Sequence, residues 1–252
     1  MGARVDEITG FPKALINGGL GYLTAVARLA PGVRVEQAQS EVDAIAHARR
    51  PSESRQAGVR EYTPGSMQLT LKSCDVRSYR TADAEPLARH ANNRKIWLNL
   101  RDAFPHPYAA KDAREFIRSV RHRTPETTFA IAMGGEAVGS VGFVLRHDVE
   151  RVSAEIGYWL AEPFWGRGIA TEVLMAVTDY AIVTHALTRV YALPFAWNAA
   201  SCRVLEKAGY VLEGRLRRSA IKNGVITDQM QYAFIVPESL NVDDLLPPGS
   251  PG

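Results

Sequence analysis

EIGYWLAEPFWGRGIATEVL, from Glu155 to Leu174, is the stretch that decides how this chain folds. Its first six residues alternate in the way that is typical of a β-strand, and Pro163 ends that strand. A joint rich in small residues follows, and a helix is predicted from Thr171 onward. Small residues let backbone N–H groups point outward, and the first turn of a helix has unpaired N–H groups at its positive end. The joint therefore predicts an anion site suited to a diphosphate.

Length and composition limit the classes of protein to consider. The 252 residues allow one large or two small domains, and 46% hydrophobic with 23% charged residues is typical of a soluble globular protein. A net charge of +3 is too small to predict nucleic-acid binding, although it suits an anionic cofactor. The two cysteines form no C-x-x-C pair and the six histidines have no ligand spacing, so we expect no disulfide, no metal and a cytoplasmic location. We also expect no membrane span and no signal peptide.

Residues 1–66 are predicted to form an N-terminal extension and linker of unknown role. Within them, Tyr22–Leu29 is predicted to be a strand, Val35–Ala48 a helix and Pro51–Ser66 a linker. Residues 22–46 weakly resemble a fragment of the core of MacB/FtsX-type ABC permeases. An early start codon, with Met67 as the true start, or a gene fusion would explain this resemblance, and a small accessory unit is the alternative. We expect residues 239–252 to be a flexible tail.

Residues 67–238 are predicted to be one domain with a central sheet. The patterns indicate strands, amphipathic helices and two hairpins, the second of them around Asn223-Gly224, which is a strong hairpin signal. Thr81 is expected to cap the first helix, and Gly209 to end the last one. The expected strands are 74–79, 129–133, 137–145, 151–160, 189–194, 210–218 and 225–236. The expected helices begin near 81, 94, 109, 171 and 198. This order indicates a mixed α+β domain.

Three stretches carry a resemblance to a known family: EIGYWL, FWGRGIATEVL and NAASCRVLEKAGY. In this order and spacing they resemble the GNAT N-acetyltransferase superfamily, and most of all its RimJ/RimL-type branch, which acetylates N-terminal amines of ribosomal proteins. The resemblance covers roughly Met67 to Val236. It implies the GNAT fold, which is a mixed, mostly antiparallel twisted sheet flanked by helices and splayed open beside the glycine joint. It also implies acetyl-CoA as the co-substrate.

The resemblance assigns a set of residues to acetyl-CoA. Trp165 stands where the family's pyrophosphate loop usually begins with Gln or Arg. The RimJ/RimL branch commonly has an aromatic residue at this position. Arg167 adds charge complementary to a diphosphate, or is an ordinary solvated surface charge. Asn198 matches the family asparagine that binds the pantetheine arm or a nearby water, and it can also cap its helix. The expected cofactor-binding residues are Trp165, Gly166, Arg167, Gly168, Ile169, Ala170, Thr171 and Asn198.

Two residues are the expected catalytic groups. Ser201 lies where this branch often has a serine near the CoA sulfur, and we expect it to protonate the leaving thiolate. Many GNAT enzymes have a tyrosine acid four residues further on, where this chain has Leu205. Glu155 matches a family carboxylate that faces the amine, and we expect it to accept the amine proton directly or through water. The alternative for Glu155 is a structural salt bridge at the end of a strand.

The leading interpretation is an acetyl-CoA-dependent N-acetyltransferase that transfers the acetyl group directly in a ternary complex. The acceptor is expected to be a protein N-terminal amine, on Ser or Ala, with a small amine such as an amino acid, polyamine or antibiotic as the alternative. A non-catalytic acyl-CoA-binding module is a third interpretation. No direct nucleic-acid or membrane partner is expected, and both a monomer and a homodimer are compatible with the sequence.

Overall fold

A computed structural model of the chain describes residues 67–236. The expectations for residues 1–66 and for the tail therefore lie outside the described residues. The strands are β1 (Gln68–Thr70), β2 (Asp75–Arg77), β3 (Thr128–Met133), β4 (Glu136–Leu145), β5 (Ser153–Leu160), β6 (Arg189–Ala192), β7 (Val211–Lys222) and β8 (Val225–Ile235). The helices are α4 (Ala84–Ala91), α5 (Arg94–Trp97), α6 (Ala110–Arg121), α7 (Ile169–His185) and α8 (Ala199–Lys207). No helix in the described part of the chain is long and apolar enough to cross a bilayer.

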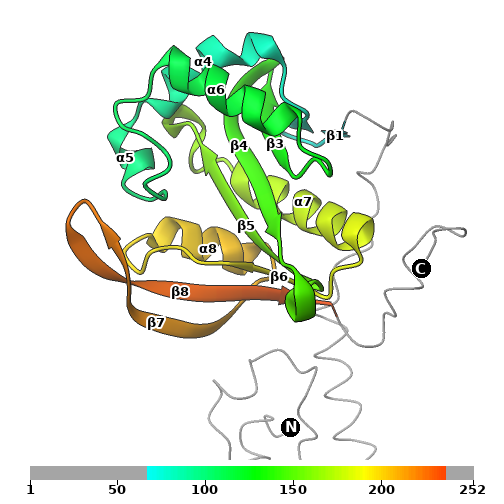
Figure 1. The fold of residues 1–252 in the computed structure, drawn as a ribbon, viewed down its shortest axis with the longest axis vertical. Helices are drawn as coiled ribbons and strands as arrows, with labels where there is room; N and C mark the ends of the chain where they lie inside the picture. The colour runs from blue at the N-terminus through cyan, green and yellow to red at the C-terminus, as the bar shows by residue number, and fades with distance from the viewer. Residues whose placement is uncertain (1–66, 237–252) are drawn as a thin grey trace, which may run out of the picture. The chain divides into compact units, whose positions relative to one another are not determined.

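The strands form one eight-stranded sheet in the order β1-β2-β3-β4-β5-β6-β8-β7 (Figure 1). All its strand pairs are antiparallel except β5 with β6, which run parallel. The β7–β8 hairpin turns at Asn223 and Gly224, whose φ angles of 50° and 77° are those of a tight hairpin turn. This architecture confirms the predicted α+β class and the second hairpin.

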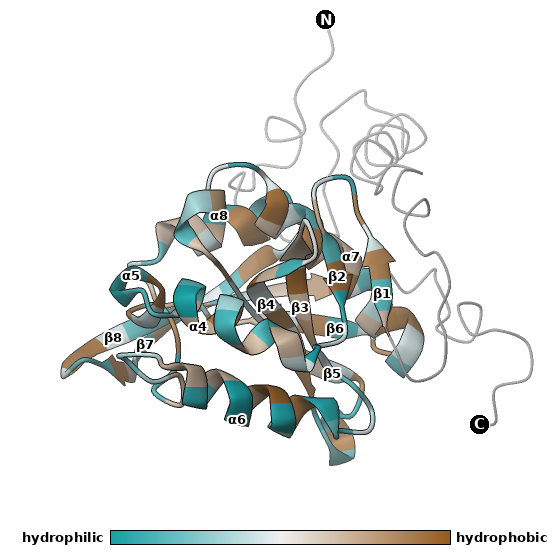
Figure 2. Cartoon of the chain, turned by 90° about the horizontal axis from the view of Figure 1, so that it is seen from above, coloured by the Kyte–Doolittle hydropathy of each residue, from teal (hydrophilic) through white to brown (hydrophobic). Residues whose placement is uncertain are grey.

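Helices cover both faces of the sheet. Alternating strand residues such as Val141 and Ile156 pack against α7 and α8 in one core cluster. On the opposite face, Ala130 and Ala137 pack against α4 and α6 in a second cluster. Figure 2 shows the resulting distribution, with brown ribbon in the central strands and alternating teal and brown ribbon along α6. The sheet is therefore buried on both sides near its centre, which fixes the direction of each β5 side chain.

The sheet opens between β5 and β6. These strands pair only from Ser153↔Arg189 to Glu155↔Tyr191. Beyond that point β5 continues to Leu160, whereas β6 ends at Ala192. Within residues 67–236, the part of β5 from Ile156 onward thus has no strand partner on its β6 side. A splayed pair of this kind leaves backbone N–H and C=O groups free to bind an extended ligand.

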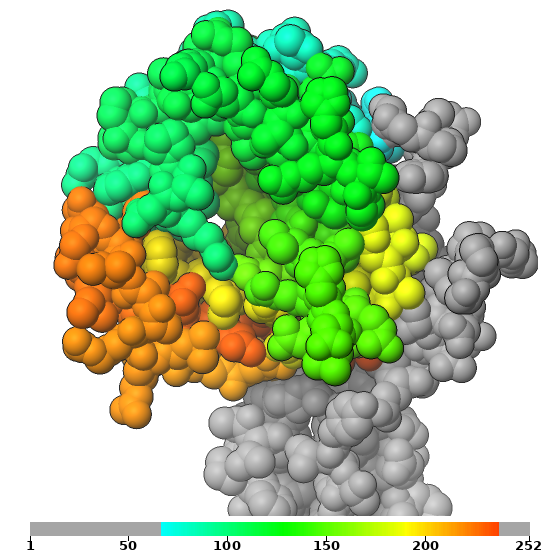
Figure 3. Space-filling model, in the orientation of Figure 1, coloured from blue at the N-terminus to red at the C-terminus, as the bar shows by residue number. Residues whose placement is uncertain are grey.

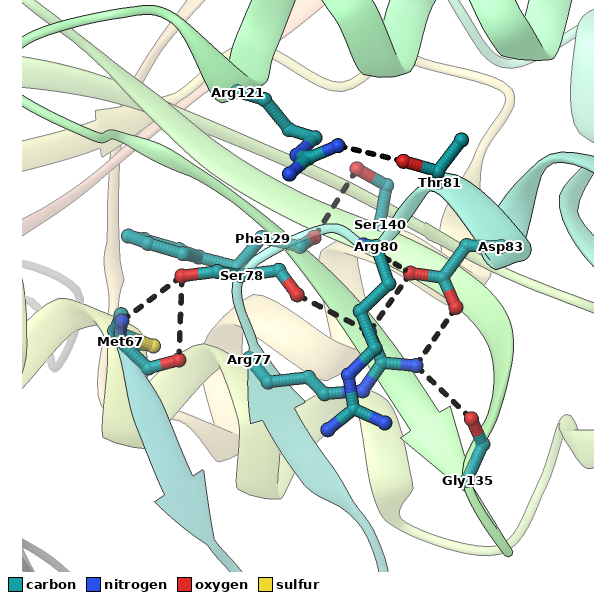
Figure 4. Close-up of polar contacts among 10 residues, drawn as sticks. All are labelled: Met67, Arg77, Ser78, Arg80, Thr81, Asp83, Arg121, Phe129, Gly135 and Ser140. Atoms are coloured by element: carbon teal, nitrogen blue, oxygen red, sulfur yellow. Dashed lines mark hydrogen bonds and ion pairs between the residues drawn. The ribbon is translucent and has the colours of Figure 1, made fainter. Parts of the chain in front are cut away.

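Two expectations at the start of the domain were wrong. The strand predicted at 74–79 is only the three residues of β2, and β1, which was not predicted, pairs with it. Thr81 does not cap a helix, because a 3-10 turn spans Thr81–Asp83 and Asp83 is the N-cap of α4. The Thr81 hydroxyl instead accepts a hydrogen bond from Arg121 (Figure 4).

Asp83 anchors this corner through a buried ion pair. Its two carboxylate oxygens each accept from a nitrogen of Arg77 at 2.8 Å, and the two side chains are only 5% and 4% exposed. Arg77 also donates to the Gly135 carbonyl, and the Asp83 carboxylate accepts from the Arg80 backbone N–H at 2.7 Å (Figure 4). The pair ties β2, the start of α4 and the β3–β4 turn together.

Candidate functional site

A large cleft lies at the opening between β5 and β6. Its volume is about 1270 Å³, which exceeds the ~300–1,000 Å³ of ordinary small-molecule sites and leaves room for two ligands. Figure 3 shows this hollow between the green upper segments and the yellow and orange ones. The cleft is lined by parts of β4, β5, the glycine joint, the start of α8 and the loop after α5.

The glycine joint forms one wall of the cleft. Gly166 and Gly168 have φ angles of 74° and 81°, which disfavour most residues other than Gly, Asn and Asp. Gly168 is the N-cap of α7, so the first N–H groups of that helix lack intrahelical partners and lie beside the cleft. Trp165 is pinned in place because its indole N–H donates to the Leu160 carbonyl at 2.6 Å.

Most of the expected cofactor-binding residues meet in this cleft. The lining includes Trp165, Gly166, Gly168, Ile169, Ala170, Thr171 and Asn198. Arg167 is the exception, because it does not line the cleft and its guanidinium lies 5.5 Å from the centre of the Phe164 ring. Two cations that sequence reasoning missed, Arg203 and Lys207, line the cleft from α8. Their spacing of four residues on one helix face was the available signal.

Asn198 and Ser201 lie together at the start of α8. The Asn198 side-chain oxygen accepts from the Ser201 backbone N–H at 3.1 Å, so the helix-cap interpretation of Asn198 is confirmed. The Ser201 hydroxyl lies 2.9 Å from the Tyr158 hydroxyl, which sequence reasoning did not single out. Burial raises the pKa of Tyr158 to about 12, so this side chain is a neutral phenol at physiological pH. A neutral phenol can donate its hydrogen to Ser201.

Glu155 faces the cleft from the opposite face of β5. One carboxylate oxygen accepts from Arg146 at 2.7 Å, and the other accepts from Arg101 in the loop after α5. The Glu155 side chain is 16% exposed. Sequence alternation indicated no basic neighbour for Glu155 on its own strand. The two arginines come from elsewhere in the chain, so Glu155 both lines the cleft and belongs to a salt-bridge network.

The loop after α5 is fastened to the β7–β8 hairpin. Lys222, at the end of β7, is 1% exposed and donates to the Asp102 carboxylate at 2.8 Å. Its ammonium also lies 4.0 Å from the centre of the Trp97 ring. This contact joins the loop after α5, which lines the cleft, to the end of β7, a segment far away in the sequence.

Comparison with known proteins identifies the domain. The sequence profile described as "Acetyltransferase (GNAT) domain" matches residues 75–211, which is more than half of the chain. The chain belongs to the GNAT acetyltransferase family. The matched residues include the whole glycine joint, Glu155 and Ser201, and the residues described above that contact them.

Relatives and solved structures agree with the family. The GNAT chain is 31% identical to the putative ribosomal N-acetyltransferase YdaF of Bacillus subtilis over 64% of its own length and 90% of YdaF. It is 26% identical to the ribosomal-protein-serine acetyltransferase of Escherichia coli, over 68% of its own length and 98% of that protein. It covers 57% of the uncharacterized N-acetyltransferase YoaA of Bacillus subtilis, at 36% identity over 40% of its own length.

The solved structures include complexes with the co-substrate. The structure of Mycobacterium smegmatis RimJ with CoA-disulfide matches with a TM-score of 0.60 and 25% identity, over 68% of this chain and 87% of that one. The microcin C7 self immunity acetyltransferase MccE, in complex with acetyl-CoA and AMP, matches with a TM-score of 0.59 and 25% identity. The match covers 66% of this chain and 94% of MccE. The GNAT domain is thus an acetyl-CoA-dependent acyltransferase domain, and acetyl-CoA is its co-substrate.

The glycine joint leads to a prediction about the co-substrate. Gly168→Asp should weaken acetyl-CoA binding about a hundredfold or more, because a carboxylate would face the diphosphate. Gly168→Asn is the matched control, since Asn and Asp both tolerate a positive φ but only Asp adds charge. Calorimetry on both folded variants measures the difference. Equal acetyl-CoA affinities for the two variants would show that no diphosphate lies at Gly168.

Proposed function

We propose that this GNAT enzyme acetylates a protein N-terminal amine on Ser or Ala, with an amino acid or another small amine as the second candidate. The proposal rests on the sequence similarity of the chain to two proteins that are named as ribosomal acetyltransferases. These are YdaF and the E. coli ribosomal-protein-serine acetyltransferase. The cleft also has room for an acceptor beside acetyl-CoA. The acceptor is tested by thiol release from acetyl-CoA across Ser- and Ala-starting peptides, amino acids, polyamines and aminoglycosides.

Transfer is direct, within a ternary complex. No cysteine is among the described residues that line the cleft: Cys74 is buried elsewhere and Cys202 does not reach the lining. A covalent acetyl-cysteine intermediate therefore has no nucleophile there. Acetyl-CoA supplies the activated acetyl group, and the backbone of the glycine joint, with Asn198 and the exposed edge of β5, holds it.

Glu155 and Ser201 serve the two proton transfers from opposite faces of β5. Glu155 lies on the sheet face where the loop after α5 contacts it through Arg101. Tyr158 and Ser201 lie on the other face, which packs against α7 and α8. The gap between β5 and β6 connects the two sides. This arrangement lets an amine enter beside Glu155, while the thiolate of CoA leaves beside Ser201.

Tyr158 acts through Ser201. If the phenol donates to the Ser201 oxygen, the serine's own hydrogen is directed away from Tyr158 and toward the cleft, where the thiolate forms. Ser201→Ala should lower kcat about a hundredfold or more. Tyr158→Phe should lower kcat about tenfold and leave the KM for acetyl-CoA unchanged, because a neutral hydrogen bond of about 1 kcal/mol is lost.

A double mutant separates these roles. In a Ser201→Ala background, Tyr158→Phe should have no further effect on kcat, because its only connection to the thiolate is gone. Independent, multiplicative losses in kcat would instead show that Tyr158 protonates the thiolate without Ser201.

A further inference from the structure

The acceptor side of the cleft carries an excess of positive charge. The described residues that line the whole cleft include six lysines and arginines, whereas Glu155 is the single carboxylate among them. Arg203 and Lys207 come from α8, on the acetyl-CoA side. Arg101 and Arg146 surround Glu155 on the other side, and Arg123 reaches the cleft from the end of α6. Two guanidinium groups on one carboxylate leave a net positive charge where the acceptor enters.

The two arginines on Glu155 are held very differently. Arg146 donates from Nε to the Tyr191 hydroxyl at 2.6 Å and lies 5.4 Å from the centre of the Tyr191 ring. The hydrogen bond to Tyr191 raises the pKa of Arg146 further above its usual value, so it stays charged. The Arg101 side chain, by contrast, is 71% exposed, and Glu155 is the partner it contacts.

Arg101 can exchange Glu155 for another anionic partner with little loss of free energy. The Arg101 end of this ion pair is largely exposed, so solvent screens it and an anion of the acceptor can replace Glu155 as the partner of Arg101. When Arg101 leaves, the Glu155 oxygen that it occupied becomes free to accept from the acceptor amine. Arg146 meanwhile keeps the other oxygen in place.

Building on the proposed function, we propose that the acceptor carries an anionic group, a carboxylate or phosphate, close to its amine, and that Arg101 moves from Glu155 to bind it. An acidic side chain near a peptide N-terminus and the carboxylate of a free amino acid present the same chemistry. Polyamines and aminoglycosides, which are polycations, are excluded by like-charge repulsion.

The same charges favour the reactive form of the amine. Only a neutral amine can attack the thioester, and nearby cations disfavour protonation of a bound amine. An acceptor whose anion binds Arg101 therefore enters with its amine close to Arg146 and Glu155. The neutral amine then forms the bond to the acetyl carbon and gives a proton to the freed Glu155 oxygen as the C–S bond breaks. The leaving thiolate takes a proton from Ser201, which regains one from solvent, directly or through Tyr158, and Glu155 releases its proton to solvent.

The test uses acceptors that differ only in charge. With the full chain and acetyl-CoA, serine is compared with serinamide, and a Ser-Asp peptide with the matching Ser-Asn peptide, by thiol release. The acidic partner of at least one pair should have a kcat/KM about ten- to a hundredfold higher, the contribution of a charged hydrogen bond. The pair that shows this preference identifies the source of the anion.

Arg101→Ala assigns the preference to one side chain. It should reduce the ratio of kcat/KM between the acidic and the amide acceptor at least tenfold, with Arg101→Lys in between. Arg114→Ala is the matched control, because Arg114 also forms an exposed ion pair, with Glu85, but does not line the cleft. It should leave the ratio unchanged.

The outcomes are distinguishable. Acetylation of neutral or cationic amines without preference for the acidic partner would overturn this inference and leave the proposed N-acetyl transfer intact. An undiminished preference in Arg101→Ala would also overturn it. Failure to acetylate any amine would overturn both proposals.

Discussion

Glu155→Gln is expected to lower kcat about a hundred- to ten-thousandfold at neutral pH, the usual cost of losing a general base. The substitution keeps the size of the side chain but removes the charge that draws the amine proton. It leaves Arg101 and Arg146 without their carboxylate, which adds repulsion against a protonated amine. Raising the pH should restore part of the rate, since the neutral form of an α-amine grows as the pH passes about 8.

The control must separate catalysis from the loss of a salt bridge. Glu136→Gln serves this purpose, because the Glu136 carboxylate also contacts two basic residues, Arg89 and His90, but does not line the cleft. Its kcat should match that of the unmodified enzyme. If Glu155→Gln also retains a normal kcat at neutral pH, the carboxylate only positions the arginines, and a water chain or an amine that is already neutral replaces it.

Asp83→Ala is expected to lower the free energy of unfolding by about 3–5 kcal/mol, because it leaves the Arg77 guanidinium buried without its carboxylate. Both side chains of this pair are nearly inaccessible to solvent, so water cannot replace the lost partner. The effect should be measured by urea unfolding of the full chain, followed at a signal from the GNAT domain.

Asp112→Ala is the matched control for this experiment. Asp112 accepts from the Ala109 backbone N–H at 2.8 Å, as Asp83 does from Arg80, but Asp112 has no buried arginine partner among the described residues. Losing this helix-start hydrogen bond alone should cost about 1 kcal/mol. Equal destabilisation by the two substitutions would show that the Arg77–Asp83 pair contributes nothing beyond that bond.

Much of the fold was predictable because its signals are local. The alternation in β5, the positive-φ glycines before α7 and the Asn223-Gly224 turn each depend on neighbouring residues. The inward face of α6 depends on local spacing in the same way, since Ala113, Ile117 and Val120 recur at helical intervals and are buried. Thr81 was misplaced because Asp83, two residues later, serves as the N-cap in its place and also pairs with a buried arginine.

The charge arrangement of the site was not predictable because its partners are distant in the sequence. Arg101 reaches Glu155 across 54 residues, and Ser201 reaches Tyr158 across 43. Lys222 and Asp102 are separated by 120 residues. No periodicity connects such positions, since the register of the sheet and the path of the α5 loop bring them together. Sequence therefore indicated residues that meet in one cleft at the glycine joint and the start of α8, whereas the charged partners of Glu155 emerged only in three dimensions.

The most direct measurement of the central claim is mass spectrometry of the acceptor combined with thiol release, in one reaction of the full chain with acetyl-CoA and a Ser-Asp peptide or serine. The account predicts one acetyl group on the primary amine for each CoA thiol released, and loss of both signals together in Glu155→Gln. Tight binding of acetyl-CoA with no acetylated amine from any acceptor, or release of CoA without an acetylated amine, would contradict it.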